Sequence, residues 1–194
     1  MLYSANNATL KINDVEILAA NASLALSAAL EANYLIGDRN TNSYSASNGI
    51  GGNLSFDYFL TGVDYFKSFI TGQGEIPQNQ SQIISGNFGG LNFDSGYLTS
   101  YSVNFSPNSP ASASASIAFF SDLKGEFSST SSAPPADVDI LNLSNAAVTS
   151  VGIGTTTEVN NFIAGTYNYN ASVAPVYLMN ETKPSSVSFG EKTI

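Results

Sequence analysis

The residue types that most often perform chemistry in proteins are scarce in this chain of 194 residues. It contains no His, Cys or Trp, and it has 6 Lys and Arg residues against 15 Asp and Glu. Without His and Cys the chain has no imidazole base, no thiol nucleophile, no disulfide and no Cys/His zinc site. Any chemistry would have to rest on carboxylates, hydroxyls or backbone amides.

Two glycine-rich stretches are fragments of phosphate-binding loops. Residues 49–52 (Gly-Ile-Gly-Gly) and 152–154 (Gly-Ile-Gly) lack the full glycine spacing and the Lys-Ser/Thr pair of such loops. Neither stretch opens a convincing helix, whose N-terminus would bind the phosphate. We interpret these residues as turn glycines.

The acidic residues offer two further possibilities. Asp137 and Asp139 would share one face of a strand and could offer two carboxylates to Ca²⁺, but few other oxygen donors lie near them in the sequence. Glycoside hydrolysis needs two acids across a sugar cleft, and no acidic residue is flanked by the aromatic and polar cluster that such a cleft requires. The sequence therefore predicts no catalytic, cofactor-binding or metal-binding residue, and a protein that is not an enzyme.

Alternation of apolar and polar side chains indicates the elements that make up the fold. Residues 54–60, 100–105 and 166–170 alternate in this way, which predicts half-buried β-strands. Residues 10–17 predict a hairpin that turns at Asn13-Asp14. The predicted fold is all-β, mainly an antiparallel β-sandwich or barrel.

Two segments of the sequence have features that favour a helix. Residues 17–30 are rich in Ala, which favours a helix by propensity, but alternation from Ser23 onward favours a strand. Residues 64–70 predict a short helix on the sheet, because Asp64 can cap it, aromatic and apolar residues form a stripe, and Gly72 ends it. We expect one or two short helices in total.

The organisation is that of one β-domain over residues 1–194 with long loops and a C-terminal β extension. Residues 37–52, 71–90 and 128–136 are rich in small and polar residues and predict long loops. They could be flexible linkers or arms that become ordered against neighbouring subunits. Residues 53–59 and 114–120 share an order of small and then aromatic residues, which fits either converging strand patterns or two related sheets.

The charge balance excludes some partners. A formal net charge of −9 argues against nucleic acid as a ligand, because binding there rests on Lys and Arg. No apolar run approaches the roughly 20 residues that span a bilayer, so we expect no membrane partner.

The order strand, loop, strand and helix over residues 23–34, 52–60 and 64–70 resembles the core of phage tail tube proteins. Residues 97–105 with 111–120 resemble its second half, so the resemblance covers roughly residues 8–127. It implies a subunit that forms rings, hexameric in this family, stacked into a tube whose lumen passes DNA. It implies no catalytic residue and no cofactor.

The resemblance also implies partners and a location. The partners would be further copies of the chain and other tail proteins such as sheath, baseplate or terminator, and the location would be the virion tail, after assembly in the host cytoplasm. An acidic wall would let DNA slide through the lumen without specific binding. Two other functions stay open: a surface-displayed β module such as a capsid decoration protein, pilus-like subunit or adhesin, and a carboxylate enzyme or small-ligand binder.

Overall fold

The computed structural model describes residues 2–5, 9–27, 30–34, 36–37, 41–46, 49–61, 64–66, 83–106, 109–128, 140, 149–152, 155–158, 164–179, 181 and 184–193. All regular elements among these residues are β-strands. The all-β prediction is confirmed. The described residues include no helix that is long and apolar enough to cross a membrane.

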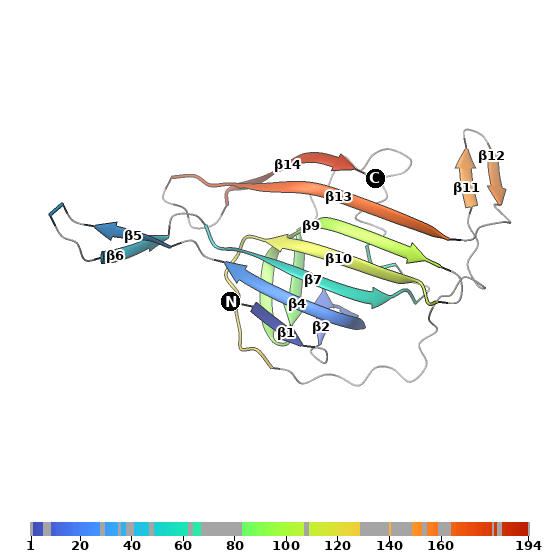
Figure 1. Ribbon diagram of the computed structural model, residues 1–194, viewed down its shortest axis with the longest axis horizontal. Coiled ribbons are helices and arrows are strands. Elements are labelled where there is room, and N and C mark those ends of the chain that lie inside the picture. The colour runs from blue at the N-terminus through green and yellow to red at the C-terminus, as the bar shows by residue number, and fades with distance from the viewer. Residues whose placement is uncertain are drawn as a thin grey trace.

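One large antiparallel sheet organises the described part of the chain, with the order β1-β4-β7-β10-β9-β8-β2-β3 and with β13 and β14 attached to β9. Its strands are β1 (Leu2–Ala5), β2 (Leu10–Ile12), β3 (Val15–Ile17), β4 (Ala19–Ser27), β7 (Gly51–Phe59), β8 (Ile84–Phe88), β9 (Leu91–Phe105), β10 (Ser112–Phe119), β13 (Gly165–Val176) and β14 (Ser186–Thr193). Two hairpins project beyond this sheet: β5 (Leu30–Tyr34) with β6 (Thr41–Ala46), and β11 (Thr149–Gly152) with β12 (Thr155–Glu158) (Figure 1).

The long strand β9 divides the sheet into two layers. One of its edges pairs with β10, while the other pairs with β8 near its start and with β13 near its end. We call β1, β4, β7, β10, β9, β13 and β14 the front layer, and β8, β2 and β3 the back layer. In Figure 1 the front layer lies across the view and β2 lies behind it. The hydrophobic core fills the space between the layers.

The core consists of the inward side chains of both layers. Leu24, Leu54 and Ile117 from the front layer and Ile84 and Phe88 from the back layer are completely buried. Each such side chain contributes about 1.5–3 kcal/mol of transfer free energy. The rings of Phe93 and Phe119 also stack, with centroids 4.8 Å apart. The alternation that predicted the strands is therefore the alternation between core and solvent.

The predicted hairpin and the Ala-rich strand are both confirmed. Asn13 and Asp14 have φ angles of 48° and 65°, as in a type I′ turn, and they connect β2 to β3. The Ala-rich segment forms β4, where Ala22 and Leu24 point into the core. Burial of alternate side chains outweighs the helical propensity of alanine here.

The loop prediction for residues 71–90 is wrong at its C-terminal end, because Ile84–Phe88 forms β8 and Gly89-Gly90 forms the turn into β9. The alternation of apolar and polar side chains in β8 is not visible in the sequence, because Gly86 occupies an inward position and has no side chain. The ring of Phe93 fills that space. Residues 71–82 lie outside the described residues. From the loop predicted at 128–136, only Ser128 is described, and its N–H donates to the carbonyl oxygen of Gly89 at 2.6 Å.

The loop prediction for residues 37–52 is wrong as well. Thr41–Ala46 pairs with Leu30–Tyr34, and Gly51 begins β7. Gly51 and Gly52 are therefore strand residues and not turn glycines. A Cβ atom at residue 52 would collide with the ring of Phe119 and the carbonyl oxygen of Ala25.

The helix predicted over residues 64–70 is not found in its described portion. Asp64 Oδ1 accepts a hydrogen bond of 2.9 Å from the Phe66 N–H, which closes a turn. Phe66 then enters the core, with its ring centroid 5.6 Å from that of Tyr101. Residues 67–70 lie outside the described part, as do Asp137 and Asp139.

The two similar segments are neighbours and not counterparts in separate sheets. Residues 53–59 lie in β7 and residues 114–119 lie in β10, and these strands pair antiparallel with Asp57 opposite Ser114. Their similarity reflects a shared environment, in which both strands bury one face and expose the other.

Gly52→Ala should destabilise the protein by about 1–3 kcal/mol, because the added Cβ displaces a packed ring and a backbone carbonyl. Gly51→Ala is the matched control, since a Cβ there meets its nearest atoms at 3.6 Å, an ordinary contact. Urea unfolding measures both variants. Equal free energies of unfolding for the two variants would contradict this account of β7.

Candidate functional site

The outer surface of the front layer, which we call the front face, consists of short polar side chains in register across five strands. The strand pairings place them in two central rows. From β4 through β7, β10 and β9 to β13, the rows are Ser23–Ser55–Ser116–Ser100–Asn170 and Asn21–Asp57–Ser114–Ser102–Asn168. Each of these positions bears a hydroxyl, an amide or, at Asp57, a carboxylate.

Hydrogen bonds within the rows hold these side chains in place. Ser55 and Ser116 share a hydroxyl–hydroxyl bond of 3.2 Å, and Ser102 and Ser114 share one of 2.7 Å. Asn53 links to this network, since its Nδ2 donates to Ser55 Oγ at 2.8 Å and its Oδ1 accepts from Ser116 Oγ at 2.9 Å. The polar surface is thus built on paired strands and positioned before any partner arrives.

The front face is hollowed at its centre. A depression of about 450 Å³ lies over β4, β7, β10 and β9. Its polar lining consists of Asn21, Ser23, Ser55, Asp57, Ser100, Ser114 and Ser116. Its volume falls in the range of small-molecule sites, about 300–1,000 Å³. In the part of the wall that the structure describes there are many hydrogen-bonding groups and one charge, that of Asp57.

Aromatic side chains flank the hollow. Tyr97 lies opposite Ala118, one row from Ser116, and its ring contacts those of Phe120 and Phe189 at centroid distances of 6.1 and 5.7 Å. At the other end of the face, Phe59 is 41% exposed. The front face therefore combines a polar centre with aromatic ends.

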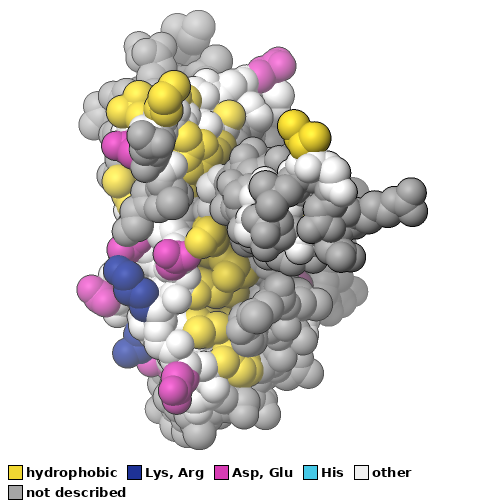
Figure 2. Space-filling model, turned by 90° about the vertical axis from the view of Figure 1, so that its left-hand side faces the viewer, with side chains coloured by type: hydrophobic (Ala, Val, Ile, Leu, Met, Phe, Trp, Pro, Cys, Tyr) yellow, Lys and Arg dark blue, Asp and Glu magenta, His cyan; other side chains and the backbone are white. Residues whose placement is uncertain are grey.

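Charged side chains gather instead on the outer surface of the back layer, which we call the back face. Strand pairing places Glu16, Lys11, Asn87, Asn92 and Lys124 in one row across it. In Figure 2 the dark blue lysine atoms lie on one side of the molecule, next to several acidic side chains. The rows of the front face contain no Lys or Arg among their described residues. The two faces are electrostatically different.

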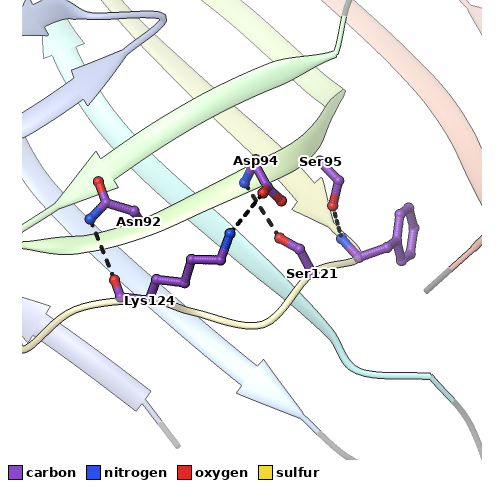
Figure 3. Close-up of polar contacts among 6 residues, drawn as sticks. Asn92, Asp94, Ser95, Ser121 and Lys124 are labelled. Atoms are coloured by element: carbon purple, nitrogen blue, oxygen red, sulfur yellow. Dashed lines mark hydrogen bonds and ion pairs between the residues drawn. The ribbon is translucent and has the colours of Figure 1, made fainter. Parts of the chain in front are cut away.

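The segment after β10, residues 120–128, fastens the β8–β9 hairpin on the back face. The backbones of Asn92 and Lys124 exchange hydrogen bonds of 2.8 and 3.0 Å, and Lys124 Nζ lies 3.2 Å from Asp94 Oδ2 (Figure 3). The ion pair is exposed, at 67% and 55% for the two side chains, so its contribution is about 0–1 kcal/mol. A second hollow, of about 520 Å³, lies on the back face next to Asn92, and its lining includes Lys11, Asp14 and Ser85.

Large tyrosines lie directly beneath the front face. Tyr58 and Tyr101 are 2% exposed. Burial is the main cause that raises the pKa of both phenols, and the carboxylate of Asp64 raises it further. Burial also raises the pKa of Tyr97 on the front face. These phenols stay protonated at neutral pH and serve as packing groups.

The edges of the front layer are a further structural feature. Within the described part of the chain, β1 pairs with β4 alone and β14 pairs with β13 alone. Each therefore leaves one row of backbone N–H and C=O groups without a strand partner in the sheet. An exposed edge of this kind can pair with a strand of another chain.

The sequence predicted no site residue, and in the described part of the chain no three acidic side chains cluster as a metal site would require. The front face was missed, although alternation of polar and apolar residues predicted four of its five strands, β4, β7, β9 and β13. What the sequence lacks is the register between strands, which brings Asp57 among five serines from four strands.

Comparison with known proteins places the chain in no family. No protein-family model matches it, and no curated protein is significantly similar to it.

The buried phenols predict that the protein loses stability in alkali. Because the pKa of Tyr58 and Tyr101 is raised in the folded state, the unfolded chain loses its phenolic protons first. Stability is therefore complete below about pH 10 and falls as the pH rises above it. Urea unfolding across this range should show the decline, and Tyr101→Phe should make it shallower. A decline that is unchanged in Tyr101→Phe would contradict the assignment.

Proposed function

We propose that this chain is a phage virion structural protein, a tail tube subunit that assembles into stacked rings around a DNA-conducting channel. The observation that carries the proposal is the front face: a hollowed sheet surface of hydroxyls and amides, with Asp57 and no described Lys or Arg in its rows. Facing the lumen, it would give phosphates no cation to bind. DNA could then pass without being held.

The two edges of the front layer support ring formation. If β1 of one subunit pairs with β14 of the next, each edge gains its missing hydrogen bonds and the sheet continues around the ring. A closed ring leaves no free edge in this layer, so further growth is limited to stacking along the axis. The back face, with its charged row, would then lie on the outside of the tube.

Assembly through strand edges should respond little to salt, because backbone hydrogen bonds and not charges hold it. We expect sedimentation to show the same oligomer in about 0.1 M and about 1 M salt, and electron microscopy to show rings or tubes. Monomers at both salt concentrations would remove the tube proposal and favour a surface-displayed β module. Dissociation by salt alone would contradict assembly through the edges.

Proline substitutions test the edge directly. Neighbouring N–H groups of a strand point in opposite directions. We therefore compare two variants of β14, Val187→Pro and Ser188→Pro. One of them removes a hydrogen bond to β13, and the other removes an N–H that points outward. We expect the variant that keeps its strand content by circular dichroism to be monomeric in sedimentation. If that folded variant still forms rings, β14 is not the contact.

The lumen assignment predicts a gain of DNA binding. Ser55→Lys with Ser114→Lys adds two cations to the hollow and should make assembled particles retain duplex DNA at low salt, with loss of binding as salt rises. The unaltered protein should retain none. As a control, Asn87→Lys adds a cation to the back face and should give tubes that bind DNA on their outside, where a nuclease can reach it. Nuclease access to DNA bound by the front-face variant would place that face outside.

A further inference from the structure

We propose that the hollow of the front face is a binding site for a short neutral oligosaccharide. This site goes beyond the proposed function, because it belongs to the single subunit and does not require the ring. It is the depression of about 450 Å³ over the two central rows, a volume suited to a few sugar rings.

The hydrogen-bonding groups of the wall match those of a sugar. Serine hydroxyls both donate and accept, and asparagine amides do the same with separate atoms. The lining residues Ser23, Ser55, Ser100, Ser114 and Ser116 provide the hydroxyls, and Asn21 provides an amide. These groups bond one another in part, and a ligand covered with hydroxyl groups can use their remaining donor and acceptor capacity in many places, whereas an apolar ligand can use none of it.

Asp57 orients the ligand in the site and selects against anionic sugars. Its carboxylate lies between Asn21 and Ser114 in the row and can accept hydrogen bonds from two neighbouring sugar hydroxyls. Among the described residues that line the hollow there is no lysine or arginine. Sugars that carry sulfate, phosphate or carboxylate groups would meet this carboxylate without a compensating cation, so the ligand is neutral.

The aromatic end of the face provides an apolar surface for a sugar ring. Tyr97 stands in the row adjacent to Ser116, half-buried, with Phe120 and Phe189 packed around it. The polar centre and this cluster lie on one continuous face. A saccharide that occupies the hollow can therefore extend one ring toward Tyr97.

The site is compatible with a tube. A lumen wide enough for duplex DNA admits a short saccharide but not a large branched polysaccharide. Binding of a short ligand by both monomers and tubes, with large polysaccharides bound by monomers alone, would place the front face inside the tube.

The test is calorimetric titration of the full chain, preceded by a screen of neutral glycans of two to five rings. We expect saturable binding, and we expect Asp57→Asn to weaken it about 10-fold, or about 1.4 kcal/mol, because a neutral amide oxygen accepts weaker hydrogen bonds than a carboxylate. The control Asp94→Asn removes a carboxylate from the back face and should leave the affinity unchanged. Tyr97→Ala should weaken binding of the longer glycans more than that of disaccharides.

The outcomes separate this inference from the proposed function. No binding across the screen, or equal affinity in Asp57→Asn and the unaltered chain, overturns the oligosaccharide site and leaves ring assembly untouched. Tighter binding of sulfated than of neutral glycans also overturns it. Saccharide binding by a chain that stays monomeric at all concentrations supports the site while it removes the tube.

Discussion

The register of β7 between β4 and β10 is the constraint on which the rest of the structure depends. The side chains of a strand alternate, so one register decides at once which residues fill the core and which form the front face. Gly52 fixes that register, because the ring of Phe119 and the carbonyl oxygen of Ala25 occupy the space of its missing side chain. A slip by one residue would turn Asp57 inward and Phe56 outward.

The same alternation couples stability to surface chemistry. Leu54, Phe56 and Tyr58 on one side of β7 are buried, while Ser55 and Asp57 on the other side line the hollow. A short serine side chain suits this position, since it leaves the sheet surface open and lets neighbouring hydroxyls bond across strands at 2.7–3.2 Å. Larger side chains would fill the hollow without improving the core.

The strands β2, β3, β4, β7, β9 and β13 could be predicted from the sequence, because alternation of side chains records burial one strand at a time. Prediction from alternation failed at β8, where the inward position of Gly86 has no side chain and the ring of Phe93 fills the space. It also failed at β6, because this strand pairs in a projecting hairpin and needs no apolar face. The front face could not be predicted for a different reason. Asn21, Asp57 and Ser114 meet only through pairings between distant segments, and no local pattern encodes those pairings.

The two outer strands of the front layer differ in charge, because β14 includes Glu191 and Lys192 while β1 has no charged residue. Soluble β-proteins often protect an edge strand with lysine or proline, but the outer strand β1 is Leu-Tyr-Ser-Ala and carries neither. Lys11, Glu16 and Lys124 lie in one row on the back face, whereas Asp57 is the charged residue in the two front rows. The outward N–H and C=O groups of β1 are therefore not shielded by charge, and either water or a strand of another chain can bond them. In the ring that we propose, pairing of β1 with β14 of the next subunit would satisfy both edges and would leave only stacking for further growth.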